Sequence, residues 1–411
     1  MSVRELRARI AKLDTEIDLQ RELLKNLERD KSLVQRQLNN VLDPVARLPL
    51  EISSEIFLQC LRPFPDHGAR NVPMLFLNIC NTWTDIALSI PALWSAINIA
   101  FPCPSGLKEL LPIWLGRARN QPLSVSFEVG EQFDEDIVAI VWRYGQKMKH
   151  LQLFEDWSED ERGDTIEDVI PGPLPSLQTL TMRGEVFTLQ YILEVLRLAP
   201  NLIEYVVYNT RILPEPNVEK VGLPNLRRLI FGEPGKRPHR DLELLEYLSL
   251  PRLEVLSIET SSHSLLAFLE QSSPPLLELI LESRNGVIDF VALAGYVPDL
   301  IRLEVWCPEY VEVETLFAAL ASQSLLPHLR TLVLHPHYQY FPEHSQAFWT
   351  MLAAALAARR TQIQVFRFMV AYRLPDSLMP GPDIAAAIRE LRRDGMHVSI
   401  SATQETWSLF D

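Results

Sequence analysis

The sequence predicts an α/β repeat protein, in which a long N-terminal helix and a small all-α block precede an array of strand–helix units. A heptad pattern of apolar residues runs through the first 42 residues. Prolines then divide residues 43–101 into short helical segments. From residue 175 onward, a proline followed by regularly spaced leucines recurs seven times. We therefore expect a coiled-coil helix over 1–42, a helical block over 43–101 and a repeat array over 105–411.

Composition and charge indicate a globular protein that does not bind nucleic acid. Of the 411 residues, 47% are hydrophobic and 22% are charged, which excludes a chain that is disordered as a whole. The formal net charge is −14, whereas a protein that binds phosphates normally carries an excess of basic residues. The only compact basic run is 236–240, which we interpret as a solvated loop, with a nuclear-localisation segment as the alternative.

The cysteines and the N-terminus favour an intracellular location. No two of the four cysteines form a CxxC pair, as is typical of reduced thiols. The chain is charged from residue 4 and lacks the apolar stretch of a secretory signal. No uncharged apolar run approaches the roughly 20 residues that span a bilayer. We expect a soluble protein of the cytoplasm, the nucleus or both, without a membrane contact.

The a and d positions of the N-terminal heptads form an apolar strip, which we name the seam. Ten of its twelve residues are apolar, and only Gln20 and Lys31 interrupt it. The seam consists of Val3, Leu6, Ile10, Leu13, Ile17, Gln20, Leu24, Leu27, Lys31, Val34, Leu38 and Val41.

The charges beside the seam suit a parallel pair of helices. Position g of one helix would then oppose position e of the other, which matches Arg9 with Asp14 and Glu16 with Arg21. A homodimer through residues 1–42 is therefore one interpretation. The alternatives are pairing with a different chain and a single helix that is free or docked on the protein.

Residues 44–100 have the pattern of short helices separated by prolines. Apolar residues keep helical spacing from Ile52 to Cys60, and Pro63 with Pro65 ends that helix. A second helix is expected to carry the apolar residues from Leu75 to Ala87, before Pro91. Helices this short bury little surface alone, so they need a partner or the following array.

Five short motifs stand in this block in a fixed order. They are Leu48-Pro49-x-Glu51-Ile52, Ile56-Phe57-x-x-Cys60-Leu61, Ile79-Cys80-x-x-Trp83, Ala87-Leu88 and Pro91-x-Leu93-Trp94. Together they resemble an F-box, in the variant with an extended loop between helices 1 and 2 that is abundant in mushroom-forming fungi. The order of a coiled coil, this block and a repeat array is similar to that group too. The sequence departs from the family pattern at Asn81-Thr82 and at Thr84, where basic residues are common.

The resemblance implies that the block docks onto the Skp-type linker protein, and through it onto the cullin, of a cullin–RING ubiquitin ligase. The alternative is a helical cap on the repeats that binds no linker. The residues implied in linker binding are Leu48, Pro49, Ile52, Ile56, Phe57, Ile79, Trp83, Leu93 and Trp94.

The recurring motif places leucine or tyrosine at fixed distances after a proline. Its spacing of 23 to 29 residues, with leucines two and five positions after the proline, is the signature of a leucine-rich repeat. The asparagine that normally follows the repeat strand is absent at all seven positions, so we expect an irregular solenoid with one strand and one helix per repeat. The motifs begin at Pro175, Pro200, Pro224, Pro251, Pro274, Pro298 and Pro327.

Apolar spacing predicts the other elements of the array. Helices are expected over 107–119, 137–147, 189–198, 264–270, 315–320, 346–358 and 384–393. Further strands are expected over 123–129, 150–154, 363–370 and 397–400.

No catalytic motif is present, so we expect no enzyme activity and no cofactor. The sequence contains no P-loop, GxGxxG, GxSxG or HExxH motif. His335, His337 and His344 are interpreted as loop residues rather than metal ligands. Residues 155–168 contain eight acids and one arginine. We interpret them as a solvated loop, with a contact for a basic partner or a calcium site as alternatives.

The repeat strands offer one shared face for a protein target. If the leucines two, five and seven positions after each proline face inward, positions four, six and eight share the opposite face. That face has mixed charge and large aromatics, which are common at interface hot spots. We therefore expect a non-catalytic, target-recognising subunit of a ubiquitin ligase; the alternatives are a repeat scaffold without a ligase role and, for Trp306, an ordinary core position. The candidate target-binding residues are Arg183, Tyr208, Arg228, Glu259, Glu282, Arg302 and Trp306.

Overall fold

A computed structural model gives the structure of the chain as two compact units. The first unit comprises Met1–Ile99 and Gly106–Ser126, and the second comprises Ala100–Ser105 and Phe127–Asp411. The structure describes residues 3–65, 67–68, 70–130, 132–155, 166–184, 187–208, 219–232, 241–259, 262–283, 288–308, 310–321, 325–336, 345–403 and 407–409.

The first unit is mainly helical, and its long N-terminal helix confirms that residues 3–42 are helical. Strands β1 (Ala96–Ala100) and β2 (Leu123–Val129) lie at its boundary with the second unit. Its helices are α1 (Val3–Leu42), α2 (Leu50–Gln59), α3 (Asn81–Ser89) and α4 (Leu107–Arg117), and its 3₁₀ helices are Val45–Arg47, Met74–Asn78 and Pro91–Trp94.

Aromatic side chains form the core of the first unit. The fully buried ring of Phe57 lies 4.1 Å from the ring of Phe76 and 4.8 Å from that of Trp83, centroid to centroid. Trp94 is also fully buried, and its ring meets that of Trp114 edge-on at 5.1 Å. Such pairs add to the stabilisation from buried apolar area, so they hold short helices that prolines separate.

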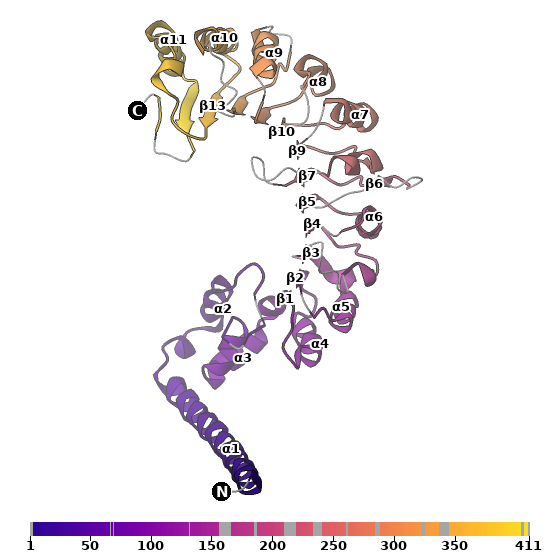
Figure 1. Cartoon of the computed structure of the whole chain (residues 1–411), viewed down its shortest axis with the longest axis vertical. Helices are drawn as coiled ribbons and strands as arrows, with labels where there is room; N and C mark the ends of the chain where they lie inside the picture. The colour runs from indigo at the N-terminus through magenta and orange to yellow at the C-terminus, as the bar shows by residue number, and fades with distance from the viewer. Residues whose placement is uncertain are drawn as a thin grey trace. The chain divides into compact units, whose positions relative to one another are not determined.

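The second unit alternates parallel strands with helices. Figure 1 shows α6 to α9 on one side of the row of strands. The helices are α5 (Glu135–Trp142), α6 (Leu189–Leu198), α7 (Ser262–Ser272), α8 (Phe290–Tyr296), α9 (Tyr310–Ala321), α10 (Ser345–Ala358) and α11 (Pro382–Arg393). The strands are β3 (Met148–Glu155), β4 (Thr179–Arg183), β5 (Glu204–Tyr208), β7 (Arg228–Phe231), β9 (Val255–Glu259), β10 (Glu278–Glu282), β11 (Arg302–Trp306), β12 (Thr331–His335), β13 (Val365–Val370) and β14 (His397–Ala402).

The strands belong to one twelve-stranded sheet in the order β1-β2-β3-β4-β5-β7-β9-β10-β11-β12-β13-β14. Two short strands, β6 (Val221–Gly222) and β8 (Leu248–Ser249), pair separately. Every pairing from β3 to β14 is parallel. The fold is therefore mixed α/β, with strands joined through helices or loops as parallel pairing requires.

The register confirms the expected alignment of the repeats. Each strand from β4 to β12 in the large sheet begins four residues after its proline, and Glu278 pairs with Arg302, which pairs with Thr331. The residues five and seven positions after the proline are buried, as Leu303 and Val305 illustrate. Positions four, six and eight consequently form rows across one face of the sheet.

The structure differs from the sequence-based prediction in several elements, among them the short strands β6 and β8. The helix expected from Leu75 to Ala87 is divided, because Cys80 is buried in an extended conformation between a 3₁₀ helix and α3. The block over 43–101 is not all-α, since residues 96–100 form β1, in which Ile97 and Ile99 are fully buried. The helix expected over 137–147 ends at Trp142 and is followed by a 3₁₀ turn, and the short α8 was not expected.

Candidate functional site

Three exposed apolar residues lie in and just before the first turns of α2, and we name them the α2 strip. It consists of Leu48, Ile52 and Ile56, which are 41%, 51% and 38% exposed. Pro49 caps the helix with an extended conformation, so α2 starts at Leu50. Ile52 and Ile56 are four residues apart on α2 and therefore lie on the same side of the helix. Leu48 precedes the helix in an extended conformation and adds a third exposed apolar side chain. Phe57 lies on the opposite, buried side.

Three of the nine residues implied in linker binding lie inside the first unit instead. Phe57, Leu93 and Trp94 are fully buried, and the indole nitrogen of Trp94 donates to the carbonyl of Ala87 at 2.9 Å. Their side chains are needed to close the aromatic core, so they cannot contact a partner directly in this structure. Ile79 and Trp83 are half-buried, and Pro49 is exposed.

Polar side chains of α3 hold the C-terminal end of α1. Arg36 donates through Nη2 to Oγ1 of Thr84 at 3.1 Å and to Oδ1 of Asn81 at 3.4 Å. Oγ1 of Thr82 donates to Oδ1 of Asn40 at 2.8 Å. These three α3 residues are the ones at which the sequence departs from the F-box pattern. They join α1 to the helical block.

Glu304 is at the centre of a polar group on the strand face of the second unit, which we name the Glu304 cluster. Its carboxylate accepts from Nη2 of Arg302 at 2.7 Å and from Nε1 of Trp306 at 2.9 Å, and it lies 3.1 Å from Nε2 of His335. The rings of Trp306 and His335 stack, 3.5 Å apart and 7° from parallel. The register places those two residues side by side on β11 and β12.

The cluster favours the ionised form of Glu304. Burial alone would raise the pKa of this carboxyl, but the hydrogen bonds from His335 and Arg302 dominate and lower the pKa to about 2. Trp306 and Arg302 remain half-exposed around the carboxylate. The arrangement fixes an indole ring and a guanidinium around one buried carboxylate.

The other candidate target-binding residues divide into accessible and buried ones. Arg183 and Arg228 are exposed, and Arg228 lies 3.4 Å from the carboxylate of Glu204 on the next strand. Glu259 and Glu282 were expected on the open face, but they are only 2% and 3% exposed.

The register places the two buried glutamates side by side. Glu259 pairs with Glu282, which pairs with Trp306 on the next strand. Neighbouring strands are about 4.8 Å apart, so large side chains in one row cover one another. The accessible part of the predicted face is therefore Arg183, Arg228, Arg302 and the half-buried Tyr208 and Trp306.

Glu304 and His335 were absent from the sequence-based set of target-binding residues. The prediction that His335 is a loop residue was wrong, because it is the last residue of β12, where it is 8% exposed and stacks on Trp306. A signal for Glu304 exists in position six of the repeats, where Val206, Ile230, Ile280 and Val333 are apolar. A single charge in such a row indicates a paired and buried carboxylate.

The acidic segment and two histidines fall largely outside the described residues. These undescribed positions include 156–165, 236–240, His337 and His344. The flanking carboxylate of Glu155 accepts from the Ile166 amide at 3.2 Å, and its burial raises its pKa to about 7. Within the described segments, no three potential metal ligands come together.

Comparison with known proteins adds no relationship: no protein-family model matches the chain, and no curated protein does. The helices in the described parts of the chain include none with the length and apolar character needed to cross a bilayer.

Proposed function

We propose that the protein is a non-catalytic substrate-recognition subunit of an SCF-type cullin–RING ubiquitin ligase. In this proposal, residues 43–101 are an F-box that docks the Skp-type linker through the α2 strip. The strand face of an irregular leucine-rich-repeat array binds the target protein. Catalysis by the ligase then depends on effective concentration, because the adaptor holds the target close to ubiquitin carried by other subunits.

The exposure of the α2 strip is the observation that carries the proposal. Leu48, Ile52 and Ile56 are exposed apolar residues in and just before α2, the helix whose Phe57 belongs to the aromatic core. The core does not need these three side chains, whereas a partner could remove them from water. They also stand within the motifs that resemble an F-box. The buried Phe57 supports the strip indirectly, because it fixes the rotation of α2.

The Glu304 cluster supports the second part of the proposal. Trp and Arg are enriched among residues that dominate binding energy, and both are held here by hydrogen bonds before a partner arrives. Fixing such side chains in advance reduces the entropy that binding would otherwise cost. Trp306 with Arg302 is therefore the best supported contact point on this face.

Replacing the α2 strip tests linker binding. We expect Leu48→Ala with Ile52→Ala to abolish co-purification of a Skp-type linker, because the removed side chains carry the apolar contact. The thermal melt should remain close to that of the parent, since both residues are exposed.

Ile113→Ala is the matched control for this experiment. Ile113 lies on α4 of the same unit and is 53% exposed, but it is outside the strip. Linker capture should survive this change. If the linker still binds after the strip is replaced, or never binds the parent, the ligase role is wrong and a repeat scaffold without linker binding is favoured.

A second experiment tests the strand face. Trp306→Ala with Tyr208→Ala should remove captured target proteins while linker capture continues, because only the second unit is altered. Tyr296→Ala, on α8 at the helix side and 40% exposed, should leave both kinds of capture intact. Unchanged target capture by the double variant would place the target surface elsewhere. A collapsed melt would show that these aromatics serve the fold.

A further inference from the structure

The seam of α1 is accessible along its whole length. No described residue of this 40-residue helix is buried, and the apolar seam residues are 43% to 68% exposed. Single exposed apolar residues are common on protein surfaces, but ten of them on one strip indicate an interaction surface. A heptad strip of this kind is stable when a second helix covers it.

The helical block contacts α1 on the side opposite the seam. Arg36 and Asn40 bond to α3, and Nδ2 of Asn39 donates to the carbonyl of Ile79 at 3.0 Å. These residues occupy heptad positions f, c and b, whereas the seam occupies a and d. The first unit therefore anchors α1 without covering the seam, even next to Leu38 and Val41.

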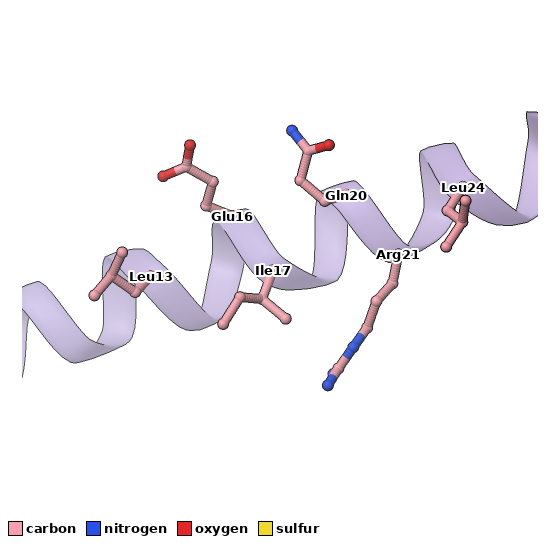
Figure 2. A pocket seen from close by; sticks show the side chains of 6 residues that line it. All are labelled: Leu13, Glu16, Ile17, Gln20, Arg21 and Leu24. Carbon is pink, nitrogen blue, oxygen red and sulfur yellow. The ribbon is translucent and has the colours of Figure 1, made fainter.

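The charges beside the seam identify its partner. A shallow pocket on α1 is lined by Leu13, Glu16, Ile17, Gln20, Arg21 and Leu24. Figure 2 shows the side chains of Glu16 and Arg21 pointing in opposite directions from the helix. In a parallel pair of identical helices, Glu16 of each copy would face Arg21 of the other.

A second pair of charges repeats this arrangement one heptad earlier. Arg9 of each copy would face Asp14 of the other in the same parallel register. The helix is thus complementary to a second copy of itself in charge as well as in apolar surface.

We propose that the protein is a dimer in which α1 pairs in parallel with α1 of a second copy through the seam. This inference does not depend on the proposed ligase role. Because α3 holds each α1 at its C-terminal end, the paired helices would carry two copies of the helical block at the same end of the coiled coil. Each assembly would therefore present two α2 strips.

Aspartates in the seam test the dimer. The full-length parent should have twice the monomer mass by light scattering at micromolar concentration. Leu13→Asp with Leu27→Asp should convert it to a monomer, because charges would lie in an apolar interface. The control is Leu19→Asp with Leu33→Asp, which makes the same changes at the exposed c positions and should remain dimeric. A monomeric parent, or a dimeric seam variant, would overturn the proposal.

A charge exchange tests the parallel register. Glu16→Arg alone and Arg21→Glu alone each place like charges across the pair, so each should dimerise several-fold more weakly than the parent. Mixing the two variants restores opposite charges at both contacts between residue 16 of one helix and residue 21 of the other, so heterodimers should predominate. The exposed Arg21–Asp18 ion pair within one helix contributes little to this comparison. A mixture that pairs no better than either variant alone would exclude the parallel register. Linker capture, which depends on α2, provides the separate readout for the ligase role.

Discussion

At the scale of single residues, the ionisation of Glu304 makes the free energy of unfolding depend on pH. A carboxyl whose pKa is lower in the folded state stabilises the fold above its unfolded pKa, and this stabilisation is lost as the pH falls through the folded value. For Glu304 the pKa falls from 4.5 to about 2, which corresponds to at most about 3 kcal/mol. The contribution is therefore complete at neutral pH and decreases between about pH 5 and pH 2.

Glu304→Gln tests this dependence. The variant keeps the shape of the side chain but loses the charge that three donors share, so its free energy of unfolding at pH 7 should fall by about 1–3 kcal/mol. The difference from the parent should shrink as denaturant melts are repeated from pH 5 toward pH 3. The control is Glu254→Gln, at an exposed ion pair with Arg227. It should change neither the free energy of unfolding at pH 7 nor its dependence on pH by much. A difference that stays constant with pH would contradict the assigned ionisation.

The sequence predicts which face of a strand a residue occupies better than it predicts whether that residue is exposed. Arg302 and Trp306 were predicted from strand alternation, and the structure brings them together on one carboxylate. Glu259 and Glu282 follow the same alternation, yet both are buried side by side on β9 and β10. Alternation assigns the face of a strand, but exposure on that face depends on the side chains of adjacent strands. Those neighbours are distant in sequence.

At the scale of elements, the repeat strands were predictable because each follows its proline at a fixed distance. The apolar residues five and seven positions after each proline are buried, so strands β4 to β12 of the large sheet begin where the motif places them. The break at Cys80 was not predictable, because apolar residues continue at helical spacing through it. Strand β1 was missed because five residues between two helices carry a weak periodic signal. Tertiary packing decided both cases.

The α1–α3 contact gives a physical role to the departures from the F-box pattern. Asn81, Thr82 and Thr84 are short polar side chains, and they accept or donate hydrogen bonds at close range to α1. Long basic side chains at these positions would place like charges beside Arg36. These three residues therefore attach the C-terminal end of α1 to the helical block.

At the scale of the whole molecule, the second unit is organised by nearest neighbours. Each interior strand of its large sheet pairs only with the strands on either side. In arrays of this kind, stability is approximately a sum of repeat and interface contributions rather than one cooperative property. Damage to one repeat should consequently spread to adjacent repeats before it affects distant ones.

Leu303→Ala tests whether stability is local in this sense. Leu303 is fully buried in β11, and removing its side chain should cost about 2–5 kcal/mol through lost contacts and a residual cavity. Hydrogen exchange should then show faster amide exchange in β10, β11 and β12, while β4 and β5 keep the protection of the parent. Leu180→Ala, at the equivalent buried position of β4, should give the reverse pattern. A uniform loss of protection across all strands in both variants would mean that the second unit unfolds as one cooperative body. A local cavity would then affect amide exchange only through the equilibrium between the fully folded and fully unfolded unit.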